Sequence, residues 1–175
     1  MDTEIIQNIT GSNKILDHKE KAVRYLKNAD HMFTQTYRSI KEPKLLLAVL
    51  ESLFLSLTNA MTAILCHERQ RREISPFHDS FESKFNVFKM EIARKYFIHQ
   101  DYINLILDIK NAIAMHSKSP VEFSRKGKFV ICTSQYETKE LTESDMKKTI
   151  SKAKVFIGIM HSILDDKPDG KWKKP

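Results

Sequence analysis

The chain has 175 residues, of which 41 % are hydrophobic, and its 29 Lys and Arg against 22 Asp and Glu give a formal net charge of +7 at pH 7. With only four Gly, five Pro and two Cys, the composition excludes a low-complexity chain and a disulfide scaffold. A chain of this length can bury one sizeable core, so we expect a single domain over residues 1–175 with its core at about 15–165.

The sequence begins MDTEIIQNITGS, which has acidic residues before any basic one and no long apolar run. A secretory signal has the opposite pattern, and Cys66 and Cys132 form no Cys-x-x-Cys pair. We therefore expect reduced thiols and a cytoplasmic location. The positive net charge favours a polyanion as partner.

Two long helices are predicted first. Apolar residues recur every three or four positions from Asp17 to Ile40, which is the helical period. Pro43 can open a second helix, whose residues stay apolar from Leu45 to Cys66. This stretch is long enough to span a bilayer, but Glu51 lies within it, and a charge in lipid costs about 2.5–3.5 kcal/mol. We therefore expect a buried helix and no membrane contact.

The second helix also carries a stripe of small residues at helical spacing, formed by Ser52, Ser56, Ala60 and Ala63. Small side chains let two helices approach closely. The stripe suits packing inside the domain or across a homodimer.

Two further helices are expected before residue 120. Ser75 and Pro76 can cap and open the third helix. The fourth begins near Asp101 and must end near His116, because Pro120 cannot continue it. The third helix presents an aromatic and apolar face made of Phe77, Phe81, Phe85, Phe88, Ile92 and Tyr96.

After Pro120 the apolar residues no longer recur at the helical period. VEF and FVICT flank the basic turn RKGK around Gly127, which predicts a β-hairpin that YETKEL can extend. Thr142 and Asp145 resemble a capping box that opens a last helix to Leu164, and the tail DDKPDGKWKKP is expected to fray. The predicted class is all-α, an antiparallel bundle of about five helices with a small β-hairpin inserted before the last.

Lys110, Asn111 and His116 are the candidate site at the end of the fourth helix. In a continuous helix, positions six apart point about 120° away from each other. Lys110 and His116 therefore converge only if the helix ends before the histidine, and HSKSP supplies such an end. Histidine suits proton transfer because its free pKa lies near neutrality. The simpler alternative is that Lys110 and Asn111 are solvated and that His116 caps the last carbonyls.

Four basic residues follow this site and can hold a phosphate backbone. The alternative is a hairpin turn that its charges keep soluble. The four residues are Lys118, Arg125, Lys126 and Lys128.

Two long helices, two further helices and a basic-Asn-His element near a helix end resemble the HEPN superfamily over residues 15–165. The resemblance implies a homodimer and a metal-independent endoribonuclease whose signature is an Arg, a polar residue and a His four to six positions further on. Lys110 takes the Arg position, Asn111 the polar position and His116 the His position. The lysine departs from the pattern because it lacks the planar fork that grips a phosphate through two hydrogen bonds.

Other Arg and His pairs fit the same spacing. Arg94 and His99 in RKYFIH are the main rival, since they include a true arginine, but no amide is adjacent. The remaining pairs lie on the first helix or straddle a helix start, and they join Arg24 to His31 and Arg71 or Arg72 to His78.

We therefore expect a domain that binds nucleic acid, RNA above other polyanions, with weak ribonuclease activity as an extension. The alternatives are a non-catalytic dimerisation or interaction module and, by the same resemblance, the HEPN partner of a minimal nucleotidyltransferase. We expect no cofactor and no metal, because no Gly-rich phosphate loop is present and His67-Glu68 lacks the second His of a zinc motif.

Overall fold

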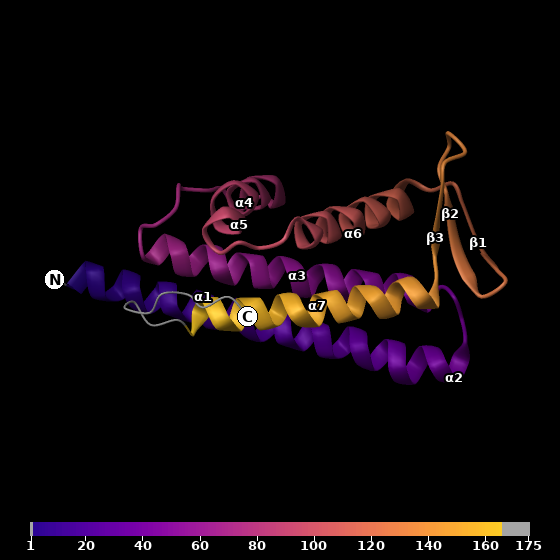
Figure 1. The fold of residues 1–175 in the computed structure, drawn as a ribbon, viewed down its shortest axis with the longest axis horizontal. Helices are drawn as coiled ribbons and strands as arrows, with labels where there is room; N and C mark the ends of the chain where they lie inside the picture. The colour runs from indigo at the N-terminus through magenta and orange to yellow at the C-terminus, as the bar shows by residue number, and fades with distance from the viewer. Residues whose placement is uncertain (1, 166–175) are drawn as a thin grey trace.

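The computed structural model describes the backbone of residues 2–165 and the side chains of residues 11–165. The chain is mostly helical with one small antiparallel sheet, which confirms the expected helical character (Figure 1). The predicted fraying tail falls on residues 166–175, outside the described residues. In chain order the elements are α1 (Asp2–His31), the π-helical turn η1 (Met32–Tyr37), α2 (Arg38–Ile40), α3 (Leu45–Gln70), α4 (Phe81–Val87), the π-helical turn η2 (Phe88–Ile92), α5 (Ala93–Lys95), α6 (Gln100–Lys118), β1 (Val121–Arg125), β2 (Lys128–Cys132), β3 (Thr138–Leu141) and α7 (Glu143–Leu164).

The first predicted helix is part of a longer helical segment. α1, η1 and α2 follow one another without interruption and end where Lys41 adopts a left-handed φ of 56°. α3 then returns along α1, and α7 lies against both (Figure 1). These three long helices carry most of the core, with α6 packed on α3.

α3 is the central helix. Its buried residues run along most of its length, from Leu46 to Glu68, which explains why the sequence shows so few polar positions there, and Glu51 and Leu55 lie on the side that reaches solvent. By length and composition it is apolar enough to cross a membrane, since its most apolar 18-residue stretch has a mean hydropathy of 1.6. However, 56 % of that stretch is buried inside the molecule. A core helix meets the same criterion.

The small-residue stripe packs within the chain. Ser56, Ala60 and Ala63 are fully buried, and the Ser56 hydroxyl donates a hydrogen bond of 2.8 Å to the Ala22 carbonyl of α1. The stripe therefore serves the close contact between α1 and α3, so it no longer argues for a dimer.

The third predicted helix begins later than expected. Ser80, not Ser75, is its N-cap: its hydroxyl accepts a hydrogen bond of 3.3 Å from the Ser83 amide. The Ser75 amide instead donates to the Glu91 carboxylate at 3.1 Å, which holds the preceding loop on η2. The prediction that Ser75 and Pro76 open this helix was therefore wrong. Either serine could serve as an N-cap, but only Ser80 is followed directly by a continuous helix.

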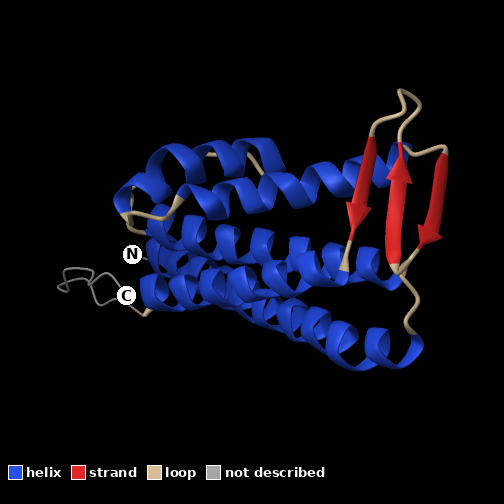
Figure 2. Cartoon of the chain, turned by 45° about the vertical axis from the view of Figure 1, so that its right-hand side comes forward, coloured by secondary structure: helices blue, strands red, loops and turns tan. Residues whose placement is uncertain are grey.

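The sheet closes one end of the helical layer (Figure 2). β1 and β2 pair antiparallel across the turn at Gly127, where φ is 74°, and β3 pairs antiparallel with β2. Phe129 and Ile131 of β2 join the helical core, as does Leu141 of β3. Thr142 then caps α7 by accepting from the Asp145 amide at 3.1 Å, as predicted.

A buried carboxylate fixes the end of α3. Glu68 has 0 % exposure, and Lys95 of α5 donates to its Oε2. The Tyr96 hydroxyl donates to Oε1 at 2.7 Å, and His67 Nδ1 lies 3.2 Å from the same oxygen. Burial alone raises the pKa of the Glu68 carboxyl, but the hydrogen bonds from these three side chains outweigh burial and lower it from 4.5 to about 2.

The lowered pKa of Glu68 makes stability depend on pH. A carboxyl with a depressed folded-state pKa stabilises the fold above its unfolded pKa, and this contribution is lost as the pH falls through the folded pKa. At about 1.4 kcal/mol per pKa unit, lowering the pKa from 4.5 to about 2 contributes roughly 3 kcal/mol. We expect Glu68→Gln to reduce the free energy of unfolding by about that amount at pH 7, measured by urea denaturation, and by progressively less between pH 4.5 and 2.

Glu51→Gln is the matched control, because Glu51 is an exposed carboxylate on the same helix. Its effect should stay within about 0.5 kcal/mol at both ends of the pH range. Equal effects of the two substitutions at pH 7 would show that the Glu68 network is not a determinant of stability.

Candidate functional site

Lys110 lies on α6 and joins it to α4. Its Nζ is 2.8 Å from Glu82 Oε1 and 4.5 Å from the centre of the Phe81 ring. The hydrogen bond from Lys110 lowers the pKa of the Glu82 carboxyl, which therefore stays ionised. The lysine is thus occupied by an ion pair and a cation–π contact at the surface.

His116 lies on α6 and joins it to the sheet. Its Nδ1 is 2.5 Å from Oε1 of Glu122 on β1, and both side chains are partly buried. A carboxylate at one ring nitrogen orients a histidine and leaves the other nitrogen to act on a second group. No hydrogen bond to Nε2 is present within the described part of the chain.

Lys110 and His116 could converge only if the helix ended before His116, and it does not. α6 continues to Lys118, and the first extended residue is Ser119, with φ −74° and ψ 124°. Proline restricts the residue directly before it, so Pro120 acts on Ser119 and leaves the preceding turn helical. Lys110 and His116 therefore point about 120° apart within one chain, and Asn111 is exposed beside the lysine.

The rival pair lies at the other end of α6. Arg94 is exposed on α5, and His99 is the N-cap of α6, where its Nδ1 accepts from the Asp101 amide at 3.3 Å. The Asp101 carboxylate is 3.4 Å from the same nitrogen. The His99 side chain is 72 % exposed, so the cap accounts for its position without any further role.

The four basic residues after His116 separate into two groups. Lys118 precedes β1, whereas Arg125, Lys126 and Lys128 surround the turn at its far end. Four residue steps at about 3.3 Å put the two ends of this strand about 13 Å apart. Lys128 is paired with Glu140 at 2.6 Å, while Arg125 and Lys126 have no ion pair among the described residues.

A second basic segment, not singled out from the sequence, lies against this turn. The Ser124 hydroxyl of β1 donates to the Glu42 carboxylate at 3.4 Å. This contact brings the α2–α3 connection, with Lys41 and Lys44, beside the hairpin. The sequence signal KEPK was visible but suggested only a helix start, because the two segments lie far apart in the chain. We call Lys41, Lys44, Arg125, Lys126 and Lys128 the basic end.

The basic end also contains acidic residues. Glu143 lies 3.4 Å from Lys41, and Glu140 pairs with Lys128. These ion pairs leave Lys44, Arg125 and Lys126 without an ion-pair partner among the described residues. Glu42 lies beside them as a third acidic residue, 3.3 Å from the Lys44 amide nitrogen, so five basic residues face three acidic ones at this end.

An exposed aromatic ring lies next to these charges. Phe129 and Ile131 face the helical core, so Val130 between them faces the other side of the sheet. Phe123 is the cross-strand partner of Val130 and is 43 % exposed. Its ring therefore lies on the outer face of the sheet, two residues from Arg125.

No metal centre is apparent in the part of the chain that the structure describes. No group of three or more His, Cys, Asp or Glu residues is placed to hold an ion there. Cys66 and Cys132 are free thiols, and burial raises the pKa of the Cys66 thiol.

Comparison with known proteins identifies no relative of this chain. No protein-family model matches the chain, and no curated protein or solved structure is significantly similar to it.

Proposed function

We propose that this chain is an RNA-binding domain, an antiparallel helical bundle of HEPN type that holds single-stranded RNA at the basic end. The observation that carries the proposal is the contact between Ser124 and Glu42, which joins two basic loops from distant parts of the sequence. Proteins gain affinity for nucleic acid by neutralising phosphates with Lys and Arg, which releases condensed counterions. Two loops supply such charges at different points along one strand of RNA.

Phe123 supports the choice of single-stranded RNA over a duplex. Proteins bind single strands by combining a basic track with aromatic side chains on which bases stack. Phe123 offers a partly exposed ring on the sheet face beside Arg125. A duplex hides its base faces, so this ring would add nothing to duplex binding.

Ribonuclease activity is a second candidate, favoured by the contact between His116 and Glu122. The carboxylate at Nδ1 holds the imidazole so that Nε2 can accept the proton of a ribose 2′-hydroxyl as it attacks its own phosphodiester. The bond from phosphorus to the 5′-oxygen of the next nucleotide breaks, which leaves a 2′,3′-cyclic phosphate, and the departing oxygen takes a proton from water. Lys110 would stabilise the negative charge on the phosphate. It must first leave Glu82, and because the two side chains diverge within one chain, the lysine would come from a second protomer.

RNA binding should fall steeply with salt. Each phosphate contact contributes about 0.7 to the slope of log affinity against log salt for single strands. Reversing Arg125, Lys126 and Lys128 to Glu should lower that slope by about 1 to 2, because Lys128 is already paired with Glu140. Fluorescence anisotropy of a labelled single-stranded RNA at several salt concentrations measures it.

The matched control reverses Lys14, Lys27 and Lys89, three exposed lysines on the helices. It changes the net charge equally and should leave the slope almost unaltered. Phe123→Ala should weaken binding by about 1–3 kcal/mol at an unchanged slope. If the basic-end variant and the control bind alike, the hairpin is only a charged turn.

A shared catalytic site requires a homodimer. Since the small-residue stripe of α3 is buried against α1, the dimer interface would have to use another surface. We expect light scattering at tens of micromolar protein to give the mass of a dimer without detergent. A strict monomer would exclude a site built from Lys110 and His116 of two protomers, but would leave RNA binding untouched.

Any cleavage should be slow, indifferent to EDTA and lost in His116→Ala. Removing a general base typically costs about 10²- to 10⁴-fold in rate. Lys110→Arg should raise the rate because a guanidinium restores two-point contact with the phosphate, and Lys110→Ala should lower it. Rates from single-turnover assays on a defined RNA, with circular dichroism for folding, measure these effects.

The controls separate the two candidate histidines. If Arg94→Ala and His99→Ala remove the activity while His116→Ala does not, the rival pair carries the chemistry. If no RNA is cut and Lys110→Arg changes nothing, the protein is a non-catalytic module. Lys110 and His116 then serve only to hold α6 on its neighbours.

A further inference from the structure

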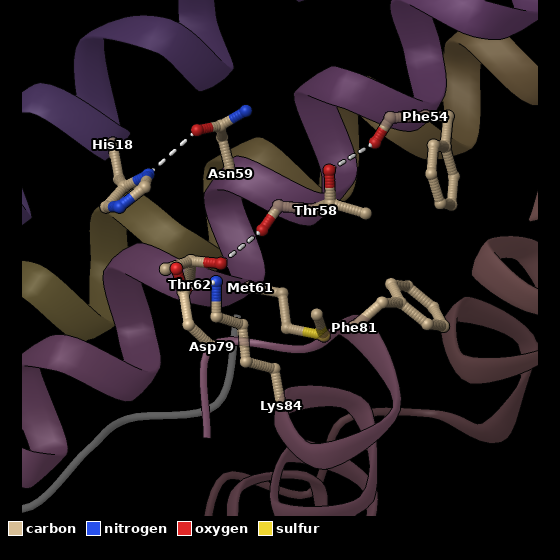
Figure 3. A pocket seen from close by; sticks show the side chains of 9 residues that line it. All are labelled: His18, Phe54, Thr58, Asn59, Met61, Thr62, Asp79, Phe81 and Lys84. Carbon is tan, nitrogen blue, oxygen red and sulfur yellow. Dashed lines mark hydrogen bonds and ion pairs between the residues drawn. The ribbon is translucent and has the colours of Figure 1, made fainter. Parts of the chain in front are cut away.

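A pocket opens between α1, α3 and the start of α4 (Figure 3). Its volume of about 260 Å³ lies just below the lower end, about 300 Å³, of typical ligand pockets, so it suits a small molecule. None of its residues belongs to the basic end. The lining consists of His18, Phe54, Thr58, Asn59, Met61, Thr62, Asp79, Phe81 and Lys84.

Lys84 is the cationic side chain of this pocket. Its side chain is only 15 % exposed, yet its counter-ion is Asp79, which is 98 % exposed at a distance of 2.5 Å. A sheltered ammonium needs an opposite charge, and here a fully solvated loop carboxylate supplies it. The hydrogen bond from Lys84 keeps the pKa of the Asp79 carboxyl below its ordinary value.

The ion pair of Lys84 and Asp79 is easily exchanged. Only the Asp79 side of the pair is exposed, and water solvates that carboxylate well once it leaves, whereas the sheltered Lys84 keeps its need for an anion. Asp79 lies outside the helices, one residue before the Ser80 cap. A carboxylate or phosphate from solution can therefore take its place without breaking a helix.

His18 gives the pocket a second basic group. Asn59 donates through Nδ2 to the Leu55 carbonyl at 2.7 Å, so its Oδ1 is the acceptor of the contact with His18 Nδ1 at 2.8 Å. This assignment puts the proton of a neutral ring on Nδ1, so Nε2 is an acceptor that can bind a protonated oxygen of a ligand, such as the P–OH of a phosphate monoester. Figure 3 shows the ring on the same side of the pocket as Asp79.

The remaining walls divide into a polar and an apolar side. The hydroxyls of Thr58 and Thr62 donate to backbone carbonyls at 2.8 Å each, which leaves their oxygens as acceptors. The rings of Phe54 and Phe81 lie 5.6 Å apart on the other side. A ligand would therefore meet the Lys84 ammonium at one end and aromatic carbon at the other, while the two threonine oxygens can only accept hydrogen bonds from it.

We propose that this pocket binds a small organic oxyanion, whose phosphate or carboxylate group pairs with Lys84 in place of Asp79 while its apolar body lies against Phe54 and Phe81. Asp79 acts as an internal competitor that neutralises Lys84 when the pocket is empty. The proposal does not rest on RNA binding, because the two surfaces share no residue.

Calorimetric titration of the full chain tests this site with phenyl phosphate and benzoate as probes. Both should bind more tightly than inorganic phosphate, which lacks the apolar body, and than benzyl alcohol, which lacks the charge. The tighter of the two probes identifies the preferred head group. Lys84→Met keeps most of the side-chain volume and should weaken binding at least about tenfold.

Asp79→Asn gives the decisive result. It removes the competing carboxylate from an exposed loop and should tighten binding by about two- to fivefold. Lys89→Met is the matched control, because Lys89 is an exposed lysine of the adjoining turn η2 that does not line the pocket. The Lys89→Met variant should bind both probes as tightly as the wild type does.

The proposal is overturned if neither probe binds at millimolar concentration to the wild type or to Asp79→Asn. It is equally overturned if Asp79→Asn binds no more tightly than the wild type. Should Lys84→Met fail to fold, the Asp79 comparison decides the matter alone. RNA binding should be the same in all these variants, so failure here leaves the function of the basic end unaffected.

Discussion

The buried carboxylate of Glu68 is the interaction on which the second half of the fold depends. It draws Lys95 and Tyr96 onto the end of α3 and so fixes where the chain returns after the loop that follows this helix. α4 carries Lys84 into the pocket and Glu82 toward α6, so the pocket and the Lys110 contact both use the segment between α3 and α6 that Glu68 anchors at α5.

Ion pairs connect α6 to α4 and to the sheet. Lys110 ties the helix to α4, and His116 ties it to β1. The residues proposed for catalysis therefore also carry structural contacts, so loss of activity in a variant does not by itself identify a catalytic group. Conservative changes that keep the contact separate the two roles.

Local signals in the sequence predicted much of the fold, and non-local contacts explain what they missed. The helical period located α1, α3, α6 and α7, and the side chain of Thr142 identified a cap. The start of α4 was misplaced because Ser75 and Ser80 are equivalent locally. Of the candidate site, the basic turn was found, but its proximity to Lys41 and the pairing of His18 with Asn59 depend on packing between distant segments, which no pattern along the chain reveals.

The position of α7 has a consequence for synthesis of the protein. This helix is the last described element, yet Phe156 and Met160 are fully buried and it packs against both α1 and α3. During translation, α1 and α3 leave the ribosome long before the helix that covers them. Their shared apolar face must therefore stay exposed until residues beyond Glu143 emerge, and such surfaces attract chaperones and promote aggregation. The core can close only after nearly the whole described chain has been made.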